Sequence, residues 1–274
     1  MPLQNFSSQS IAVNGTSINV LRTGTPDTFP TSTPTLVFLH YWGGSSRTWL
    51  PTIHHLATSF PCLAIDFRGF GQSSTTSSDL SIPTLASDVL AVLASLSITN
   101  YVLVGHSMGG KTAQLIATDR PDGLRGLVLV APAPASPIHV PESQRLDMVH
   151  AYESPDSILA VLDGVLSHAP LSTELRAQVV EDSGRVSEDA RRAWPERGLT
   201  YGFEDRVGAI AVPTLVVGAA EDRVDRVDVL KVEVLGRIEG AQLAVIEGSG
   251  HLIPLEAPGE VARLLMEFAG AQGW

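Results

Sequence analysis

Cysteine is almost absent from this chain, which has one, Cys62, among its 274 residues. A single cysteine cannot form an internal disulfide, so a disulfide-stapled fold is excluded and a reducing compartment is expected. Long apolar runs are lacking too, because the longest, residues 207–220, is interrupted by Pro213. Residues 1–15 contain no basic stretch and no apolar segment of signal-peptide length. We therefore expect a soluble, cytoplasmic protein without a membrane partner.

Positive charge is also in deficit. The chain has 18 Lys and Arg against 29 Asp and Glu, which gives a formal charge of −11. This balance argues against nucleic acid or an anionic membrane surface as a partner, and a small-molecule substrate is the expected one. The sequence does not indicate an oligomeric state.

The sequence lacks the patterns of metal and cofactor sites. It has no His-Glu-x-x-His and no paired cysteines, and the adjacent His54 and His55 would point to different faces of a helix. The short motif Gly69-Phe70-Gly71 lacks the third glycine and the following helix of a dinucleotide-binding loop. We expect no metal and no cofactor.

Short apolar segments alternate with helix-like ones along most of the chain. An Asn14-Gly15 turn first predicts a β-hairpin, and residues 82–96 are apolar at helical spacing. Further strands are expected at 35–39, 62–65, 101–104, 127–130, 214–217 and 242–246. Apolar strands separated by helices predict an α/β fold with a mostly parallel, doubly wound sheet, covered by helices on both faces.

The pattern changes between the strands expected at 127–130 and 214–217. Residues 133–208 contain no convincing strand and instead offer amphipathic segments at 142–152, 156–167, 173–182 and 187–194. We interpret this region as a helical cap inserted into the sheet domain. The predicted division is a core of residues 1–132 and 209–274, with an insertion of residues 133–208.

One stretch has the pattern of a nucleophile elbow. Residues 101–104 favour a strand, Gly105-His106-Ser107-Met108-Gly109 follows, and residues 112–118 are compatible with a helix. This order of strand, sharp turn and helix presents a serine hydroxyl at the end of a sheet. Ser107 is therefore the candidate nucleophile, and the amide of Met108, in the first helical turn, is a candidate donor to an oxyanion.

A serine needs a base, and the base needs a group that orients it. His251 follows the last predicted strand and is the candidate base. The acid is expected after the strand at 214–217, where Asp222 is the first choice and Glu221 and Asp225 are alternatives. Asp225 is expected instead to cap or begin the next helix, because a carboxylate there is favourable for the helix dipole.

Other residues around the predicted site receive supporting roles. The backbone N–H of Trp42, in the loop after the strand at 35–39, is the candidate second oxyanion donor, with Tyr41 next. Asp66 and Arg68 are expected to form a salt bridge beside the elbow, and Lys111 is expected to serve packing or the surface. The candidate substrate-binding residues are Tyr41, Trp42, Trp194 and Tyr201, with core packing as an alternative for the last two.

Five motifs together resemble the α/β-hydrolase fold superfamily over nearly the whole chain. They are residues 40–44, 66–71, 105–109, 218–222 and 250–254. The resemblance implies the triad Ser107, Asp222 and His251, and one departure from it is Tyr41, where members usually carry glycine after the histidine.

The serine at position 107 excludes the relatives whose nucleophile is an aspartate, the epoxide hydrolases and haloalkane dehalogenases. The implied function is cleavage of a carboxylic ester, lactone or thioester through an acyl-enzyme, as in a carboxylesterase. The alternatives are carbon–carbon bond hydrolysis, perhydrolysis or hydroxynitrile cleavage with the same triad, or a ligand receptor with low turnover.

Overall fold

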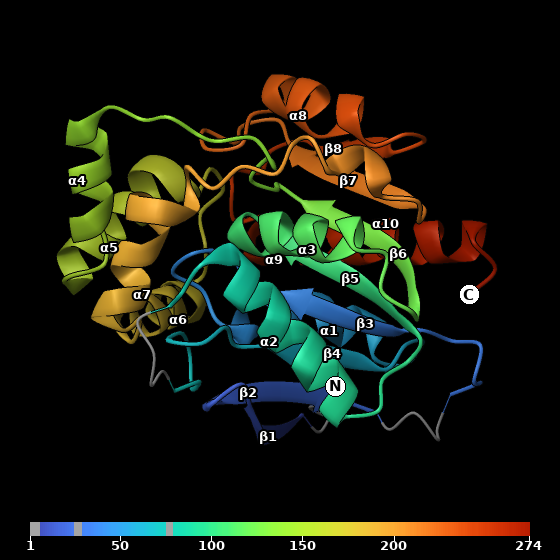
Figure 1. Cartoon of the computed structure of the whole chain (residues 1–274). Helices are drawn as coiled ribbons and strands as arrows, with labels where there is room; N and C mark the ends of the chain where they lie inside the picture. The colour runs from blue at the N-terminus through green and yellow to red at the C-terminus, as the bar shows by residue number, and fades with distance from the viewer. Residues whose placement is uncertain (1–5, 25–28, 75–78) are drawn as a thin grey trace.

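The structure is a computed structural model that describes residues 6–24, 29–74 and 79–274. An eight-stranded sheet with the order β1-β2-β4-β3-β5-β6-β7-β8 crosses the molecule (Figure 1). The strands are β1 (Ser7–Val13), β2 (Thr16–Thr23), β3 (Thr35–Leu39), β4 (Cys62–Ile65), β5 (Tyr101–His106), β6 (Leu124–Val130), β7 (Thr214–Ala219) and β8 (Gln242–Ile246). Strand β2 pairs antiparallel with β1 and β4, and all the other pairs are parallel. The predicted α/β fold with a mostly parallel sheet is confirmed.

The N-terminal hairpin forms as its turn residues predict. Asn14 and Gly15 have φ angles of 48° and 72°, both in the left-handed region that a tight two-residue turn requires. The prediction that the chain carries no signal peptide rests partly on residues 1–5, which lie outside the described residues.

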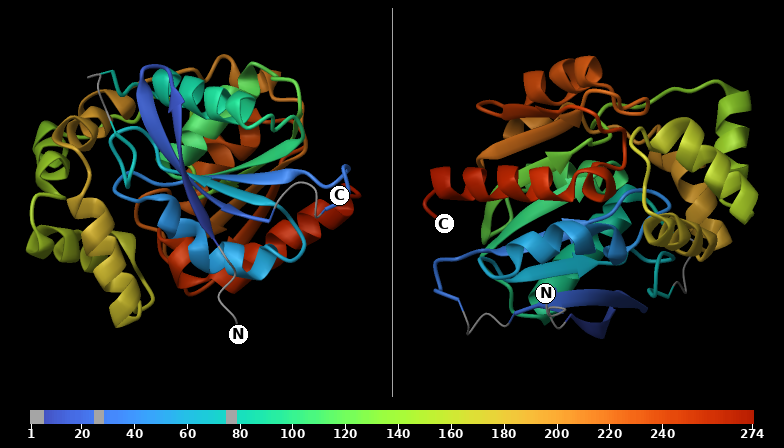
Figure 2. Two further views of the ribbon diagram at one scale, coloured as in Figure 1. Left: turned by 90° about the horizontal axis from the view of Figure 1, so that it is seen from below. Right: turned by 180° about the vertical axis from the view of Figure 1, so that it is seen from behind.

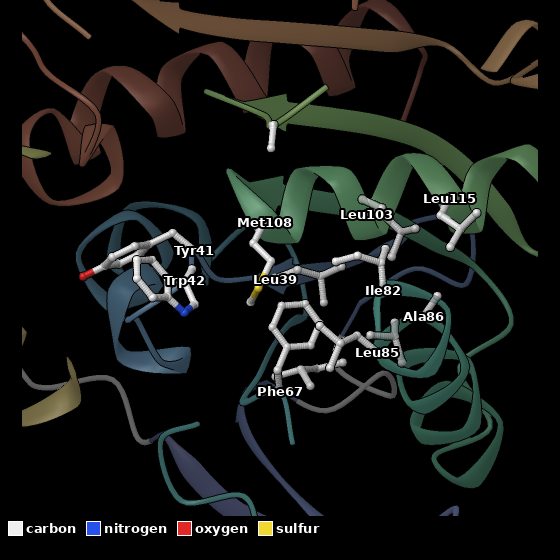
Figure 3. Packing of buried hydrophobic residues seen from close by; sticks show 14 of the residues in the cluster. Leu39, Tyr41, Trp42, Phe67, Ile82, Leu85, Ala86, Leu103, Met108 and Leu115 are labelled. Atoms are coloured by element: carbon white, nitrogen blue, oxygen red, sulfur yellow. The ribbon is translucent and has the colours of Figure 1, made fainter. Parts of the chain in front are cut away.

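Two layers of helices cover the sheet, because side chains alternate between its faces. On β3, Val37 and Leu39 join one apolar cluster while Leu36 and Phe38 join the other. Helices α2 (Ile82–Ser95) and α3 (Met108–Thr118) lie in front in Figure 1, and α1 (Leu50–Leu56) and α10 (Pro258–Ala271) lie together on the opposite face (Figure 2). Figure 3 shows the first cluster, in which α2 and α3 pack Leu85 and Leu115 against the core.

The region between β6 and β7 is helical, as predicted. Residues 133–208, which we call the helical insert, contain no strand and lie together beside the sheet (Figure 1). Its helices are α4 (Glu142–His150), α5 (Pro155–Val161), α6 (Thr173–Gly184) and α7 (Glu188–Ala193), and π-helical turns follow α5 and α7 at Leu162–Leu166 and Trp194–Gly198. The described part of the chain includes no helix that combines the length and the hydropathy needed to cross a membrane.

Shorter elements complete the fold on both sides of the last strand. Helix α8 (Val227–Glu233) precedes β8, and α9 (Ile253–Glu256) follows it. Within the described residues, the 3₁₀ turns are η2 (Ser46–Trp49), η5 (Val207–Ala209) and η6 (Leu235–Arg237). The turn η2 leads directly into α1, and Pro51 lies at the start of that helix, where proline is favoured in a first helical turn.

The predicted salt bridge between Asp66 and Arg68 is wrong. The Arg68 guanidinium is buried and binds both carboxylate oxygens of Asp88 on α2, at 2.5 and 2.6 Å. Asp66 instead accepts hydrogen bonds from the Asn19 side chain (2.8 Å) and from the amides of Ser46 (2.5 Å) and Gln72 (2.9 Å). Arg68 therefore pairs with Asp88, 20 residues away, rather than with the nearby Asp66. Asp66 is not available to it, because donors from three other segments already bind its carboxylate.

Removing one partner of the buried Arg68–Asp88 pair should destabilise the fold strongly. We expect Asp88→Ala to lower the free energy of unfolding by about 3 kcal/mol or more, since it leaves a buried guanidinium without its counter-charge. Urea denaturation at pH 7 measures this loss. Asp119→Ala, which removes the exposed pair with Arg206, is the matched control and should change the midpoint little. Equal losses in the two variants would contradict this account.

Candidate active site

The chain turns sharply at Ser107, between β5 and α3. Its φ of 53° and ψ of −115° lie outside the regions that residues with a β-carbon usually adopt. The Ser107 amide donates to the carbonyls of Val130 and Ala131, both at 3.1 Å, and its carbonyl accepts from the amides of Lys111 (3.0 Å) and Ala133 (3.1 Å). Such a conformation persists only when the surroundings fix it, and these four bonds do so.

Glycines on both sides of Ser107 allow the turn to pack. A β-carbon on Gly109 would lie 2.5 Å from the carbonyl oxygen of Leu39 on β3, and one on Gly105 would collide with the Gly109 carbonyl. The helix therefore approaches β3 and β5 at a distance that only glycine permits. The closeness of this packing fixes Ser107 at the carboxyl end of the sheet.

His251 and Asp222 form a buried pair at the same end of the sheet. Asp222 follows β7, His251 follows β8, and the His251 Nδ1–H donates to Asp222 Oδ2 at 2.9 Å. The other carboxylate oxygen, Oδ1, accepts from the amides of Val224 (2.7 Å) and Asp225 (3.1 Å). Both carboxylate oxygens of Asp222 therefore have donors, so the carboxylate is fixed and the imidazole is oriented.

The charges of this pair shift both pKa values. Burial, the largest single effect, opposes the charged imidazole, but the Asp222 carboxylate with its hydrogen bond, aided by Asp225 and Glu256, raises the pKa of His251 above 6.5. Burial likewise opposes the Asp222 carboxylate, but His251 and the two amides outweigh it and hold the pKa of Asp222 below 3.8. The pair is thus suited to stabilise a positive charge on the imidazole.

Two other histidines support the backbone of the site. The His106 Nε2–H donates to the carbonyl oxygen of His251 (2.8 Å), and His40 Nδ1–H donates to that of Tyr41 (2.7 Å) while its Nε2 accepts from the Phe67 amide (3.1 Å). Burial, as the largest effect, lowers the pKa of both imidazoles below 6.5, so both are neutral near pH 7. Each neutral ring therefore holds one segment of the site.

Two backbone amides at the site are free to bind a ligand. The amides of Trp42 and Met108 have no hydrogen-bond acceptor within the residues that the structure describes. The Met108 side chain points into the core toward Leu39 and Phe67, so only its backbone faces the turn (Figure 3). The Trp42 amide belongs to the same peptide as the Tyr41 carbonyl, which also accepts from the Gly44 amide at 3.0 Å.

The helical insert binds the loop that carries Trp42. The Tyr152 hydroxyl donates to the Trp42 carbonyl (3.0 Å), and the Ser183 hydroxyl donates to the Gly43 carbonyl (2.8 Å). The hydroxyl of Ser45 in turn donates to Asp182 on α6 (2.9 Å). Three hydrogen bonds thus link the insert to Trp42, Gly43 and Ser45 of this loop, which fixes the loop's position relative to the insert.

A cavity of about 530 Å³ opens at the site, and Ser107 and His251 both line it. The insert supplies most of the remaining wall, which is mainly apolar: Ala133, Pro134, Ile138, Val140, Met148, Ala151, Tyr152, Val161, Val165, Leu166, Trp194 and Leu199. Of the predicted substrate-binding residues, Tyr41, Trp42 and Trp194 line the cavity. Tyr201 does not, because its ring packs beside Phe203 at a centroid distance of 5.9 Å.

The structure corrects the roles predicted for Asp225 and reveals the surroundings of Lys111. Asp225 does not cap α8: the residue at that position is Arg226, and Asp225 is buried in the cavity wall. Lys111 is fully buried, and its ammonium donates to the carbonyls of Ser136 (3.3 Å) and Leu199 (3.5 Å), near the two ends of the insert. Neither position was evident from sequence, because charged residues are usually exposed.

Residues 6–24, 29–74 and 79–274 include no group of three or more His, Cys, Asp or Glu side chains placed to hold a metal ion. The groups present include an imidazole capable of proton transfer (His251), a hydroxyl capable of nucleophilic attack (Ser107) and backbone amides without an acceptor among the described residues.

The chain belongs to the alpha/beta hydrolase family, whose family model matches residues 36–264. An esterase of Mycobacterium tuberculosis is 30% identical over 244 residues, which cover 83% of this chain and 80% of that protein. A monoacylglycerol lipase of Mus musculus is 23% identical over 273 residues, which cover 87% of this chain and 76% of the relative.

A solved structure gives the same fold. The structure of Est816, an enzyme that degrades N-acyl homoserine lactones, has a TM-score of 0.81 and 26% identity, and it covers 95% of this chain and 100% of that one. The predicted resemblance to α/β hydrolases is confirmed, and the relatives of this chain include esterases and lipases.

The buried Lys111 ammonium predicts a pH-dependent stability. Burial lowers the pKa of Lys111 to about 8, from 10.5. The unfolded chain therefore binds more protons between these values, and stability gains from Lys111 as pH rises through this window. We expect the wild type to gain about 2 kcal/mol relative to Lys111→Met between about pH 7.5 and 9.5, measured by urea denaturation.

The exposed Lys231 provides the matched control for this prediction. The stability difference between the wild type and Lys231→Met should stay constant over the same pH range. A difference between the wild type and Lys111→Met that is equally flat would show that the Lys111 pKa is not lowered in the folded protein.

Proposed function

We propose that this protein hydrolyses carboxylic esters, lactones or thioesters through an acyl-enzyme formed on Ser107. The observation that carries the proposal is that Ser107, in its strained turn, lines one apolar cavity with His251, whose Nδ1–H donates to the buried Asp222. The esterase of Mycobacterium tuberculosis and the monoacylglycerol lipase of Mus musculus support an ester as the substrate, and Est816 supports a lactone.

In the proposed reaction, the Ser107 hydroxyl loses its proton to Nε2 of His251 while its oxygen attacks the carbonyl carbon. Asp222 stabilises the resulting imidazolium, since its carboxylate accepts from Nδ1. The carbonyl oxygen becomes an oxyanion, and the amides of Trp42 and Met108 donate to it. His251 then protonates the leaving alcohol, and an attacking water repeats the steps to release the acid and restore Ser107.

We further propose that the helical insert, residues 133–208, acts as the cap of a core made of residues 1–132 and 209–274. Most of the apolar cavity wall comes from the insert, which therefore selects the acyl or alcohol group. A cytoplasmic location stays a prediction from the sequence.

Replacing the nucleophile should abolish turnover. We expect Ser107→Ala to lose at least about 10³-fold in kcat on p-nitrophenyl esters and to lose covalent labelling by a fluorophosphonate, because no oxygen remains to form the acyl-enzyme. The control is Ser136→Ala, a half-buried serine whose hydroxyl binds Glu233, and it should keep both properties. Labelling of the wild type without ester turnover would instead favour a ligand receptor.

The activity should depend on a base whose pKa lies above the ordinary histidine value. His251 accepts the serine proton only when neutral, and its folded pKa is raised above 6.5. We therefore expect kcat/KM to fall as pH decreases through a value above 6.5. A profile measured from pH 5 to 9 with one substrate checks this, and a rate that stays flat below pH 6.5 would contradict the role of His251.

The variant Asp222→Asn tests the other member of the His251–Asp222 pair. Because the Asp222 carboxylate is the largest of the effects that raise the pKa of His251, the acidic limb of the pH profile should move to lower pH in this variant. Its kcat should fall by up to about 10⁴-fold, since an amide favours the wrong imidazole tautomer. A variant with near wild-type kcat would assign the acid to another residue.

A further inference from the structure

A buried carboxyl group without a partner lies in the wall of the cavity. Asp225 is only 5% exposed, and its Oδ2 is buried without a hydrogen-bond partner among the described residues. The residue lines the cavity together with Ser107 and His251. Buried polar atoms are nearly always hydrogen-bonded, so an unpaired carboxyl in the wall of a cavity is a candidate to bind a ligand.

The neighbouring groups already have partners of their own. Both oxygens of Asp222 are bound, and Asp225 contributes only its backbone amide to that residue. The Lys111 ammonium donates to two carbonyl oxygens rather than to Asp225. The Arg223 guanidinium donates to the Gly164 carbonyl at 2.7 Å. None of these three groups therefore occupies the Asp225 carboxyl, which lies in the wall of the cavity.

The surroundings favour the neutral form of this carboxyl group. Burial, the largest effect, raises the pKa of Asp225 to about 7, and the Asp222 carboxylate acts in the same direction. The charges of His251 and Lys111 oppose this rise. Below about pH 7 the group is therefore a neutral acid with one O–H donor, which can bind an oxygen atom of an uncharged ligand.

We propose that the neutral Asp225 side chain donates a hydrogen bond to an uncharged oxygen of the substrate, outside the bond that is cleaved. Asp225 would thus select esters that carry a second oxygen, as an ether, ketone or amide, over esters that are purely hydrocarbon. An ammonium ligand fits less well, because Lys111 lies close enough to influence Asp225 and would repel a second cation. This inference rests on the proposed ester hydrolysis.

Matched pairs of substrates test the selection. Each pair consists of a p-nitrophenyl ester with an all-carbon acyl chain and its analogue in which an ether oxygen replaces one methylene, with the oxygen moved along the chain. A second series places the oxygen in the alcohol of a hexanoate ester. At pH 6 we expect the ether oxygen at one position of the series to raise kcat/KM by about fivefold or more over the all-carbon ester. At that position the oxygen accepts the hydrogen bond of the buried Asp225 carboxyl. An ether oxygen without a partner would lower kcat/KM instead.

Variants at position 225 separate the hydrogen bond from other effects. Asp225→Asn keeps a donor and should keep the preference for the ether, whereas Asp225→Leu has none and should reverse it. Asp228→Asn, at an exposed carboxylate on α8, is the matched control and should leave the preference unchanged. Because each result is a ratio of kcat/KM values within one protein, general changes in activity or folding cancel.

The ratio of kcat/KM for the ether ester to that for the all-carbon ester should depend on pH. If Asp225 had a purely structural role, this ratio would not change with pH. Asp225 loses its proton as pH rises through about 7, so the preference for the ether should disappear by pH 9 in the wild type. In Asp225→Asn the preference should persist at both pH values. The effect of His251 cancels, since both esters of a pair use the same base.

The proposal is overturned if no oxygen position in either series is preferred, or if Asp225→Leu keeps the preference. Efficient hydrolysis of the all-carbon esters in those cases would leave the proposed function intact. A preference for ammonium-bearing esters that grows above pH 7 would overturn the neutral donor and assign Asp225 an ionic role. Absence of turnover on every ester would instead contradict the proposed function itself.

Discussion

The chain passes from β5 into α3 through Ser107 with a φ of 53°, while Gly109 packs against the carbonyl oxygen of Leu39. No regular element would hold a serine in this conformation by its own propensity. Four backbone hydrogen bonds and the close contact with β3 impose it, and they hold the serine in the wall of the cavity. The cavity, the buried acid–base pair and the free amides all lie around this one strained residue.

The parallel sheet explains why distant residues meet there. Ser107, Asp222 and His251 follow β5, β7 and β8, and the carboxyl ends of parallel strands lie along one edge. The order of strands therefore brings Ser107 and His251, which are more than a hundred residues apart in sequence, to one cavity, with Asp222 buried behind His251. The buried His251–Asp222 pair is stable in this place because each partner satisfies the other's hydrogen bond, which offsets the cost of removing both from water.

The insert is structurally coupled to the site as well as covering it. Tyr152 and Ser183 bind the carbonyls of Trp42 and Gly43, so movement of the insert would disturb the loop that bears a free amide. The same insert provides most of the apolar wall, together with the polar residues Gln144 and Asp147, whereas Asp225 comes from the loop after β7. Shape selection by the insert and polar selection by Asp225 would therefore act from different elements of the fold.

The sequence by itself determined the alternation of strands and helices, the elbow around Ser107 and the placement of His251 after the last strand. These depend on local patterns: hydrophobic period, glycine spacing and order along the chain. The choice of Asp222 among three nearby carboxylates was also made from sequence, and the structure pairs that residue with His251.

Only the tertiary structure decided which charged side chains are buried and with what partners. Arg68 binds Asp88 rather than Asp66, Asp225 lines the cavity rather than capping α8, and Tyr201 packs away from the cavity. Such choices depend on atoms that are distant in the chain and on the loss of water around each group. Because a sequence pattern records neither distance nor burial, these contacts emerge only when the chain is folded.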